Sequence, residues 1–159
     1  MIWLFGVLVV IPLAVNYAAC RVDYQRHMDA FMLASMLCVF WAVTNSIGML
    51  CEFPESKKFH SLIDLLGLLT CVASYVTARR RWKAYLALIF LVQLGAHAAF
   101  WWAYDGNTAG SIAYAYKLTL NLTWLAQLVC VGASGGVVIL GRIIDHLRNR
   151  RSHRHLGRA

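Results

Sequence analysis

The sequence predicts an all-α protein, an integral membrane bundle of five transmembrane helices. The prediction rests on apolar runs of bilayer length, few charged residues, and basic residues concentrated in alternate loops. Of the 159 residues, 60% are hydrophobic and 14% are charged, whereas an ordinary soluble domain has roughly 45–50% and 25%. Because a soluble fold of this size could not bury so much apolar surface, we expect one bundle within a membrane and no separate soluble domain.

The apolar runs define the expected helices. A helix needs about 20 residues to cross a hydrocarbon layer about 30 Å thick. In chain order the expected spans are residues 2–19, 30–50, 59–78, 84–104 and 118–140, and residues 111–117 form an interfacial segment before the last one. In an alternative with four spans, the first run lies on the membrane surface or is removed.

The basic loops orient the bundle. The loop at residues 79–83 reads RRRWK, and polytopic membrane proteins retain such loops in the cytoplasm. With this loop inside, alternation also places the loop of Arg21 and Arg26 and the C-terminal tail inside. These three segments hold four, two and six of the 15 Lys and Arg residues, and the outer loops hold Lys57, Lys58 and Lys117. The charges therefore predict an N-terminus outside and a C-terminus in the cytoplasm, in the cell inner membrane.

The basic residues also predict a lipid partner. We divide the chain into a bundle, residues 1–141, and a basic cytoplasmic tail, residues 142–159. Attraction to anionic headgroups is worth about 1 kcal/mol per basic residue near the surface. Nucleic acid is not expected, because no aromatic stacking platform accompanies the tail. The residues expected to meet anionic lipid are Arg79, Arg80, Arg81, Lys83, Arg148, Arg150 and Arg151.

Polar residues within the spans are the candidates for function. A charged side chain at mid-bilayer costs about 2.5–3.5 kcal/mol on insertion scales, and only Asp64 and His97 raise this question. Both fall in the outer half of their spans. Asn45 and Asn121 reach similar depths on two other helices, and Gln93 stands one turn from His97 on the same face. These five residues form the predicted polar intramembrane site.

Two interpretations of this layer stay open. In the first, which the sequence favours, the side chains tie helices together by hydrogen bonds worth about 0.6–2 kcal/mol each, and Gln127 at a comparable depth joins them. In the second, the layer is a site open to the outside in which Asp64 and His97 bind a cation or relay a proton. His97 is the better candidate because it lies deeper.

Enzymatic and cofactor chemistry are not expected. Ser46, His97 and Asp64 are the residue types of a catalytic triad, yet no G-x-S-x-G turn surrounds the serine. Haem iron is commonly held by a His or a His pair, and only His97 lies well inside a span. The five cysteines show no C-x-x-C spacing, so neither a metal site nor a disulfide framework is predicted.

Small residues predict close helix packing. Gly132 and Gly136 stand four apart in the last run, and another face carries Asp64, Gly67, Cys71, Ser74 and Ala78. Such faces let helix backbones approach closely, within one bundle or between copies.

Two classes of function follow from these features. The first is a small membrane protein that self-associates, or packs with other membrane subunits, as a pore former or an accessory subunit. Holins share this general architecture, which is an analogy and not a motif match. The second is a small transporter or channel for an ion, a proton or a solute, with the polar site facing outward. The sequence favours the first class, because it lacks a clear inverted repeat of the transporter type.

Overall fold

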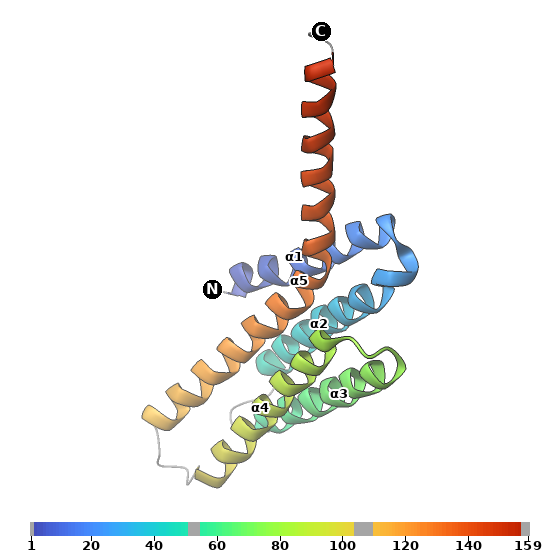
Figure 1. Ribbon diagram of the computed structural model, residues 1–159. Coiled ribbons are helices and arrows are strands. Elements are labelled where there is room, and N and C mark those ends of the chain that lie inside the picture. The colour runs from blue at the N-terminus through green and yellow to red at the C-terminus, as the bar shows by residue number, and fades with distance from the viewer. Residues whose placement is uncertain (1, 51–54, 104–109, 157–159) are drawn as a thin grey trace.

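The structure, a computed structural model, describes residues 2–50, 55–103 and 110–156, with side chains for residues 7–25, 27–50, 58–103 and 110–148. Within these ranges the chain is all-helical, as the sequence predicts (Figure 1). The five helices are α1 (Ile2–Val22), α2 (Tyr24–Leu50), α3 (Glu55–Thr77), α4 (Arg81–Ala103) and α5 (Ser111–Leu156).

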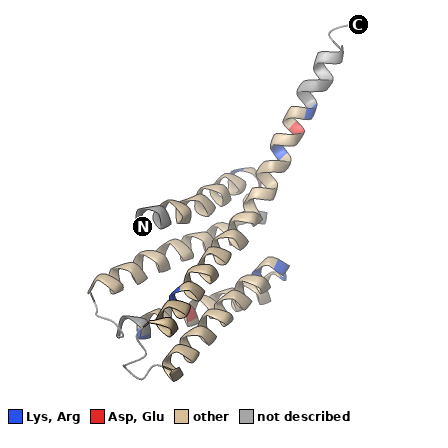
Figure 2. Cartoon of the chain, turned by 90° about the vertical axis from the view of Figure 1, so that its left-hand side faces the viewer, with Lys and Arg blue, Asp and Glu red and all other residues tan. Residues whose placement is uncertain are grey.

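Four of the helices are long and apolar enough to cross a membrane. Their apolar stretches are His27–Leu50, Lys58–Thr77, Arg81–Ala103 and Ser111–Arg148, and the described part of α1 contributes a shorter one, Val7–Val22. Figure 2 shows that the coloured Lys and Arg residues lie mostly towards helix ends and on the projecting part of α5. This pattern supports a membrane protein.

Each helix packs against its neighbour in the chain, and α5 also packs against α1 and α2. Helices α3 and α4 form an antiparallel pair, and α1 packs against α2 and α5. Helix α5 is one continuous helix of 46 residues, and its C-terminal part extends beyond the other helices (Figure 1). The structure differs here from the expected interfacial segment at residues 111–117, because α5 begins at Ser111 and already packs into the bundle at Tyr116. It also runs without a break across the expected domain boundary at residue 141.

Helix α1 is joined to α5 through a buried asparagine. Asn16 is fully buried, and its Nδ2 donates to Pro12 O of its own helix at 2.8 Å and to Val131 O of α5 at 3.0 Å. Gly135 allows this approach, since a Cβ there would lie 2.8 Å from Asn16 Oδ1 and 3.1 Å from Asn16 Cα. The Asn16 amide thus forms a hydrogen bond between α1 and α5 within a contact that is otherwise apolar.

The small-residue faces differ from the sequence prediction in detail. A Cβ at Gly132 would meet Pro12 at an ordinary 3.6 Å, while a Cβ at Gly136 would meet nothing within 4 Å. Gly135, which the sequence analysis did not single out, is the residue of closest approach. On α3 the predicted face does pack inside the bundle, because a Cβ at Gly67 would overlap the Phe90 ring of α4.

The basic loop contributes one residue to the interior. Lys83 was expected to meet lipid, yet its side chain is fully buried. Its Nζ lies 2.7 Å from Asp29 Oδ2 of α2 and donates to Ser74 O of α3 at 2.9 Å. Lys83 lies near the start of α4, beside the start of α2 and the end of α3. Its ammonium therefore joins three helices. Arg79 and Arg81 are exposed, Arg80 is half-buried, and the side chains of Arg150 and Arg151 lie outside the described residues.

Candidate functional site

The polar residues predicted from the sequence line one cavity. It has a volume of about 400 Å³ and lies between α2, α3, α4 and α5. The five predicted residues on its wall are Asn45, Asp64, Gln93, His97 and Asn121, and four further polar residues are Thr44, His60, Lys117 and Gln127. Because Lys117 and Asn121 are exposed, the cavity reaches the protein surface near the N-terminal end of α5.

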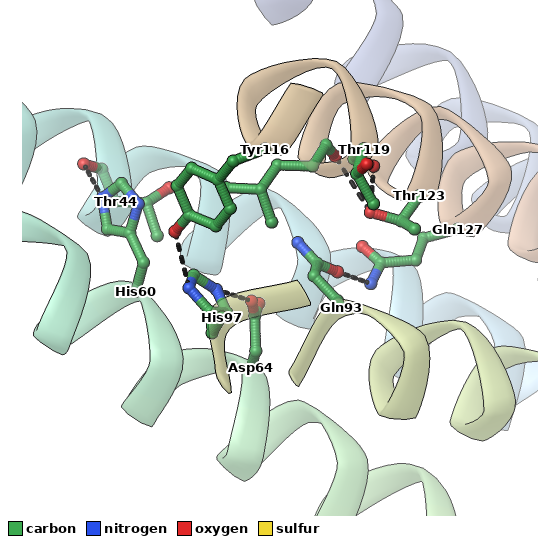
Figure 3. Close-up of polar contacts among 10 residues, drawn as sticks. Thr44, His60, Asp64, Gln93, His97, Tyr116, Thr119, Thr123 and Gln127 are labelled. Atoms are coloured by element: carbon green, nitrogen blue, oxygen red, sulfur yellow. Dashed lines mark hydrogen bonds and ion pairs between the residues drawn. The ribbon is translucent and has the colours of Figure 1, made fainter. Parts of the chain in front are cut away.

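A carboxylate, an imidazole and a phenol form a continuous network, in which Asp64 and His97 line the cavity and Tyr116 bonds to His97 (Figure 3). His97 is only 2% exposed, and its Nε2 lies 2.8 Å from Asp64 Oδ2. On the other side of the ring, Tyr116 Oη lies 2.6 Å from His97 Nδ1. The three residues come from α3, α4 and α5, so the network joins three helices and uses both nitrogens of the imidazole.

Antiparallel packing places Asp64 and His97 at the same level. Asp64 lies six residues after Lys58, where the apolar stretch of α3 begins, and His97 lies six residues before Ala103, where that of α4 ends. At 1.5 Å per residue both are about 9 Å from the end of the stretch. One turn along α3, Gly67 leaves room for the Phe90 ring, which allows the close approach.

An aromatic stack positions the tyrosine. The Tyr116 ring stacks on Phe100 with ring centroids 4.2 Å apart and planes inclined by 20°. Phe100 is 2% exposed and precedes the end of α4. Because the stack on Phe100 already orders the Tyr116 ring, a hydrogen bond between its hydroxyl and His97 costs little further conformational entropy. The stack therefore favours this contact.

A second polar pair lies deeper along the same helices. Gln127 Nε2 donates to Gln93 Oε1 at 2.6 Å, and both residues are buried (Figure 3). The bond uses one half of each amide. Gln93 Nε2 and Gln127 Oε1 therefore give the wall one further donor group and one further acceptor.

The remaining predicted residues are on the wall but outside these two groups. Asn45 Nδ2 donates to Trp41 O of its own helix at 2.7 Å, and Asn121 is exposed. Ser46 is exposed and its hydroxyl donates to Ala42 O at 2.9 Å. The structure thus pairs His97 with Asp64 and Tyr116, and it does not bring Ser46 to them.

Tyr116 is the site residue that the sequence analysis missed. It was assigned to an interfacial segment, where tyrosine is common. A signal was present, because Tyr116 and Gln127 are eleven residues apart, three helical turns, and so share one face. That face continues through Leu120 and Thr123. A helix drawn from Ser111 onward would have placed the phenol and the amide on the same side.

The network can hold or release a proton. Imidazole is the side chain that changes charge near neutral pH, and here it lies between a carboxylate and a hydroxyl that can either donate or accept. Among the residues with described side chains, no three His, Cys, Asp or Glu residues gather to hold a metal ion. Asp64 and His97 line the cavity and so offer it polar groups that can hydrogen-bond a small guest.

Fold and site together define the class: an all-helical chain, four of whose helices are long and apolar enough to cross a membrane, with a polar network between them. Comparison with family models, with curated proteins and with solved structures gives no significant match.

Proposed function

We propose that the chain is a small multi-pass membrane carrier. It moves a solute or ion through the cavity lined by α2, α3, α4 and α5 in exchange for a proton. The observation that carries the proposal is the joining of a buried Asp64, His97 and Tyr116 network to a cavity of about 400 Å³. Ligand sites of small molecules are typically about 300–1,000 Å³, mostly apolar, with a few convergent polar groups. Ionisable residues within membrane spans commonly mark such pathways.

The proposed topology has five spans. Helix α1 has 21 residues, about 31 Å at 1.5 Å per residue, which is enough to cross the hydrocarbon layer. The twelve-to-three distribution of Lys and Arg places the N-terminus outside, the C-terminus in the cytoplasm and the cavity in the outer half. Reporter fusions within the loop at residues 79–81 and at Ala159 test this topology. Both should be active only as cytoplasmic reporters, and opposite results would refute the assigned number of spans between them.

Self-association stays a prediction. Of the two residues that suggested it, Gly132 meets Pro12 of α1 within the chain, whereas a Cβ at Gly136 would meet nothing within 4 Å. A pore former or an accessory subunit stays a prediction, and the cavity favours the carrier. The exposed Arg142 and Arg148 are the described tail residues proposed to meet anionic headgroups.

The test is proton movement in proteoliposomes that enclose a pH-sensitive dye. Four solute classes are added in turn: alkali chlorides, zwitterionic amino acids, neutral sugars and organic ammonium salts. We expect at least one class to change the internal pH faster with the unmodified protein than with His97→Gln, which retains a donor and an acceptor but does not titrate. Lack of response to all four classes, with folded protein inserted in the vesicles, would refute the carrier.

A further inference from the structure

The cavity combines features that select one class of solute. We infer that it binds a small monovalent organic cation, which competes with a proton on the Asp64, His97 and Tyr116 network. The inference rests on the proposed function and names its substrate. Three observations support it: the bonding pattern of the network, the residues that line the cavity, and the volume of the cavity.

The network has two states that differ by one proton. With both ring nitrogens protonated, His97 donates to Asp64 and to Tyr116 Oη, and the charges of Asp64 and His97 cancel. With the Nδ1 proton released to solvent, Tyr116 turns its hydroxyl to donate to Nδ1, and Nε2 still donates to Asp64. Both states retain the contacts at 2.8 and 2.6 Å, and the second carries one net negative charge.

That negative charge lies in an environment that penalises it. Asp64 is 7% exposed and His97 is 2% exposed, and burial disfavours a net charge unless an opposite charge is near. Two other titratable residues line the cavity, His60 and Lys117. Lys117 is exposed, and its flexible stem lets the ammonium reach solvent. A cation in the cavity therefore stabilises the deprotonated network. Protonation of the network removes its negative charge and so releases the cation.

The walls suit an organic cation. The cavity is lined by four large aromatic residues from three helices, Phe40, Trp41, Phe90 and Trp124. The face of an aromatic ring attracts cations, most strongly Trp, by about 0.5–2 kcal/mol. The volume of about 400 Å³ would hold about a dozen waters at ~30 Å³ each, far more than a bare metal ion requires. Lys117 on the wall disfavours a second positive charge, which makes the preferred guest monovalent.

Binding to the purified full-length protein in detergent tests the inference directly. The probe is benzyltrimethylammonium, whose charge is permanent and whose ring matches the aromatic lining. Isothermal titration between pH 5.5 and 8.5 should show affinity rising with pH, up to about tenfold per unit while the network still holds its proton. Repeating it in buffers of different ionisation enthalpy should show release of up to one proton per cation bound. Binding that is independent of pH would overturn the inference.

Matched solutes test the charge of the guest. Benzyl alcohol keeps the ring without a charge, and phenylalanine adds a carboxylate to an ammonium. Both should bind at least tenfold more weakly than benzyltrimethylammonium. Equal or tighter binding of either one would refute the preference for a cation.

Variants separate the charge from the fold. Asp64→Asn should weaken cation binding at least tenfold, and His97→Gln should retain binding but flatten its pH dependence, because the carboxylate remains. Lys117→Gln, at an exposed position that spares the core, should tighten binding a few-fold. Asp145→Asn removes an exposed acid on the projecting part of α5 and should change nothing. Weaker binding in Lys117→Gln would contradict the inference even if Asp64→Asn failed to fold.

The proteoliposome assay distinguishes this inference from the proposed function. Because the exchange moves a proton out for each cation that enters, benzyltrimethylammonium added outside should alkalinise the interior, and only in vesicles with intact Asp64 and His97. If alkali ions or amino acids drive a His97-dependent pH change and the organic cation does not, the inference falls and the carrier stands. If no class does so, both fall.

Discussion

The two ends of the bundle both bury ionisable groups, and they bury them differently. At one end Lys83 is fully enclosed, and its ammonium contacts Asp29 and the Ser74 carbonyl. At the other end Asp64 and His97 are paired as closely, at 2.8 Å, but they stand on the wall of a cavity. We call these the closed end and the cavity end.

In the proposed function, this difference separates a structural pair from a functional one. A buried ion pair contributes little to stability compared with well-packed apolar residues, although removing one partner alone is strongly destabilising. At the closed end the Lys83 side chain has no exposed surface, although that of Asp29 is 42% exposed. At the cavity end Asp64 and His97 line a cavity of about 400 Å³. Similar N···O distances, 2.7 and 2.8 Å, therefore accompany different proposed roles, and the free volume beside the second pair distinguishes them.

The largest expected effect is at the closed end. Asp29→Ala leaves the Lys83 ammonium buried without its carboxylate and should lower the free energy of unfolding by about 3 kcal/mol. Lys83→Met removes the buried charge and leaves an Asp29 side chain that is 42% exposed, so it should cost clearly less. Thermal unfolding in detergent measures both variants. A greater loss of stability in Lys83→Met than in Asp29→Ala would show that the ion pair contributes more to stability than the unpaired buried charge costs.

The next effect concerns the contact between α1 and α5. Gly135→Ala places a Cβ against Asn16, including its backbone, and should destabilise by about 2 kcal/mol through overpacking. Gly136→Ala is the matched control in the next position, where nothing lies within 4 Å. It should leave the unfolding temperature unchanged or slightly raised, since alanine favours helix over glycine. Equal effects of the two substitutions would contradict the described register of α1 on α5.

A smaller effect is expected for the same substitution at the cavity end. Gly67→Ala forces the Phe90 ring to move, and the cavity that Phe90 lines gives it space. We expect about 1 kcal/mol of destabilisation, together with weaker binding of benzyltrimethylammonium because the ring then fills part of the cavity. Gly95→Ala on α4, with open space around it, is the control. Strong destabilisation with unchanged binding would mean that the ring has no cavity to enter.

The smallest effect on stability is expected for His97→Gln. Glutamine can still bond Asp64, so unfolding should change by less than about 1 kcal/mol, whereas His97→Leu leaves Asp64 unpaired and should cost more. Proton exchange should be lost in both variants. A folded His97→Gln that still exchanges protons would reduce the cavity end to a structural tie like the closed end.

The sequence predicted the fold class and much of the polar wall. Apolar runs of bilayer length located the helices. Helical depth selected Asp64, His97, Asn45 and Asn121, and the one-turn spacing from His97 added Gln93; the structure places all five on one cavity. Depth works because neighbouring antiparallel helices start and stop at the same surfaces. It cannot say which faces meet, and the one-turn spacing paired Gln93 with His97, where the structure bonds Gln93 to Gln127.

Other features depended on contacts between helices that a pattern does not encode. In the sequence Lys83 belongs to a basic loop, and only the packing of α2 places Asp29 beside it. Gly135 differs from Gly136 only in facing Asn16 of α1, which is 119 residues earlier in the chain. Tyr116 was missed for a different reason, because the long apolar run was divided at residue 118 to match one bilayer thickness. Helix α5 exceeds that thickness without dividing.

The position of the Asp64 and His97 pair also bears on how the chain enters the membrane during synthesis. Both residues belong to one helical hairpin, α3 and α4, and both lie six residues from the same edge. Each alone would oppose insertion, an aspartate at this depth by less than the roughly 2.5–3.5 kcal/mol that it costs at the membrane centre. A hairpin that leaves the translocation machinery as a unit buries them already bonded to each other. In the proposed topology α5 follows this hairpin into the membrane, so the pair is neutralised first and is joined by Tyr116 only when α5 packs.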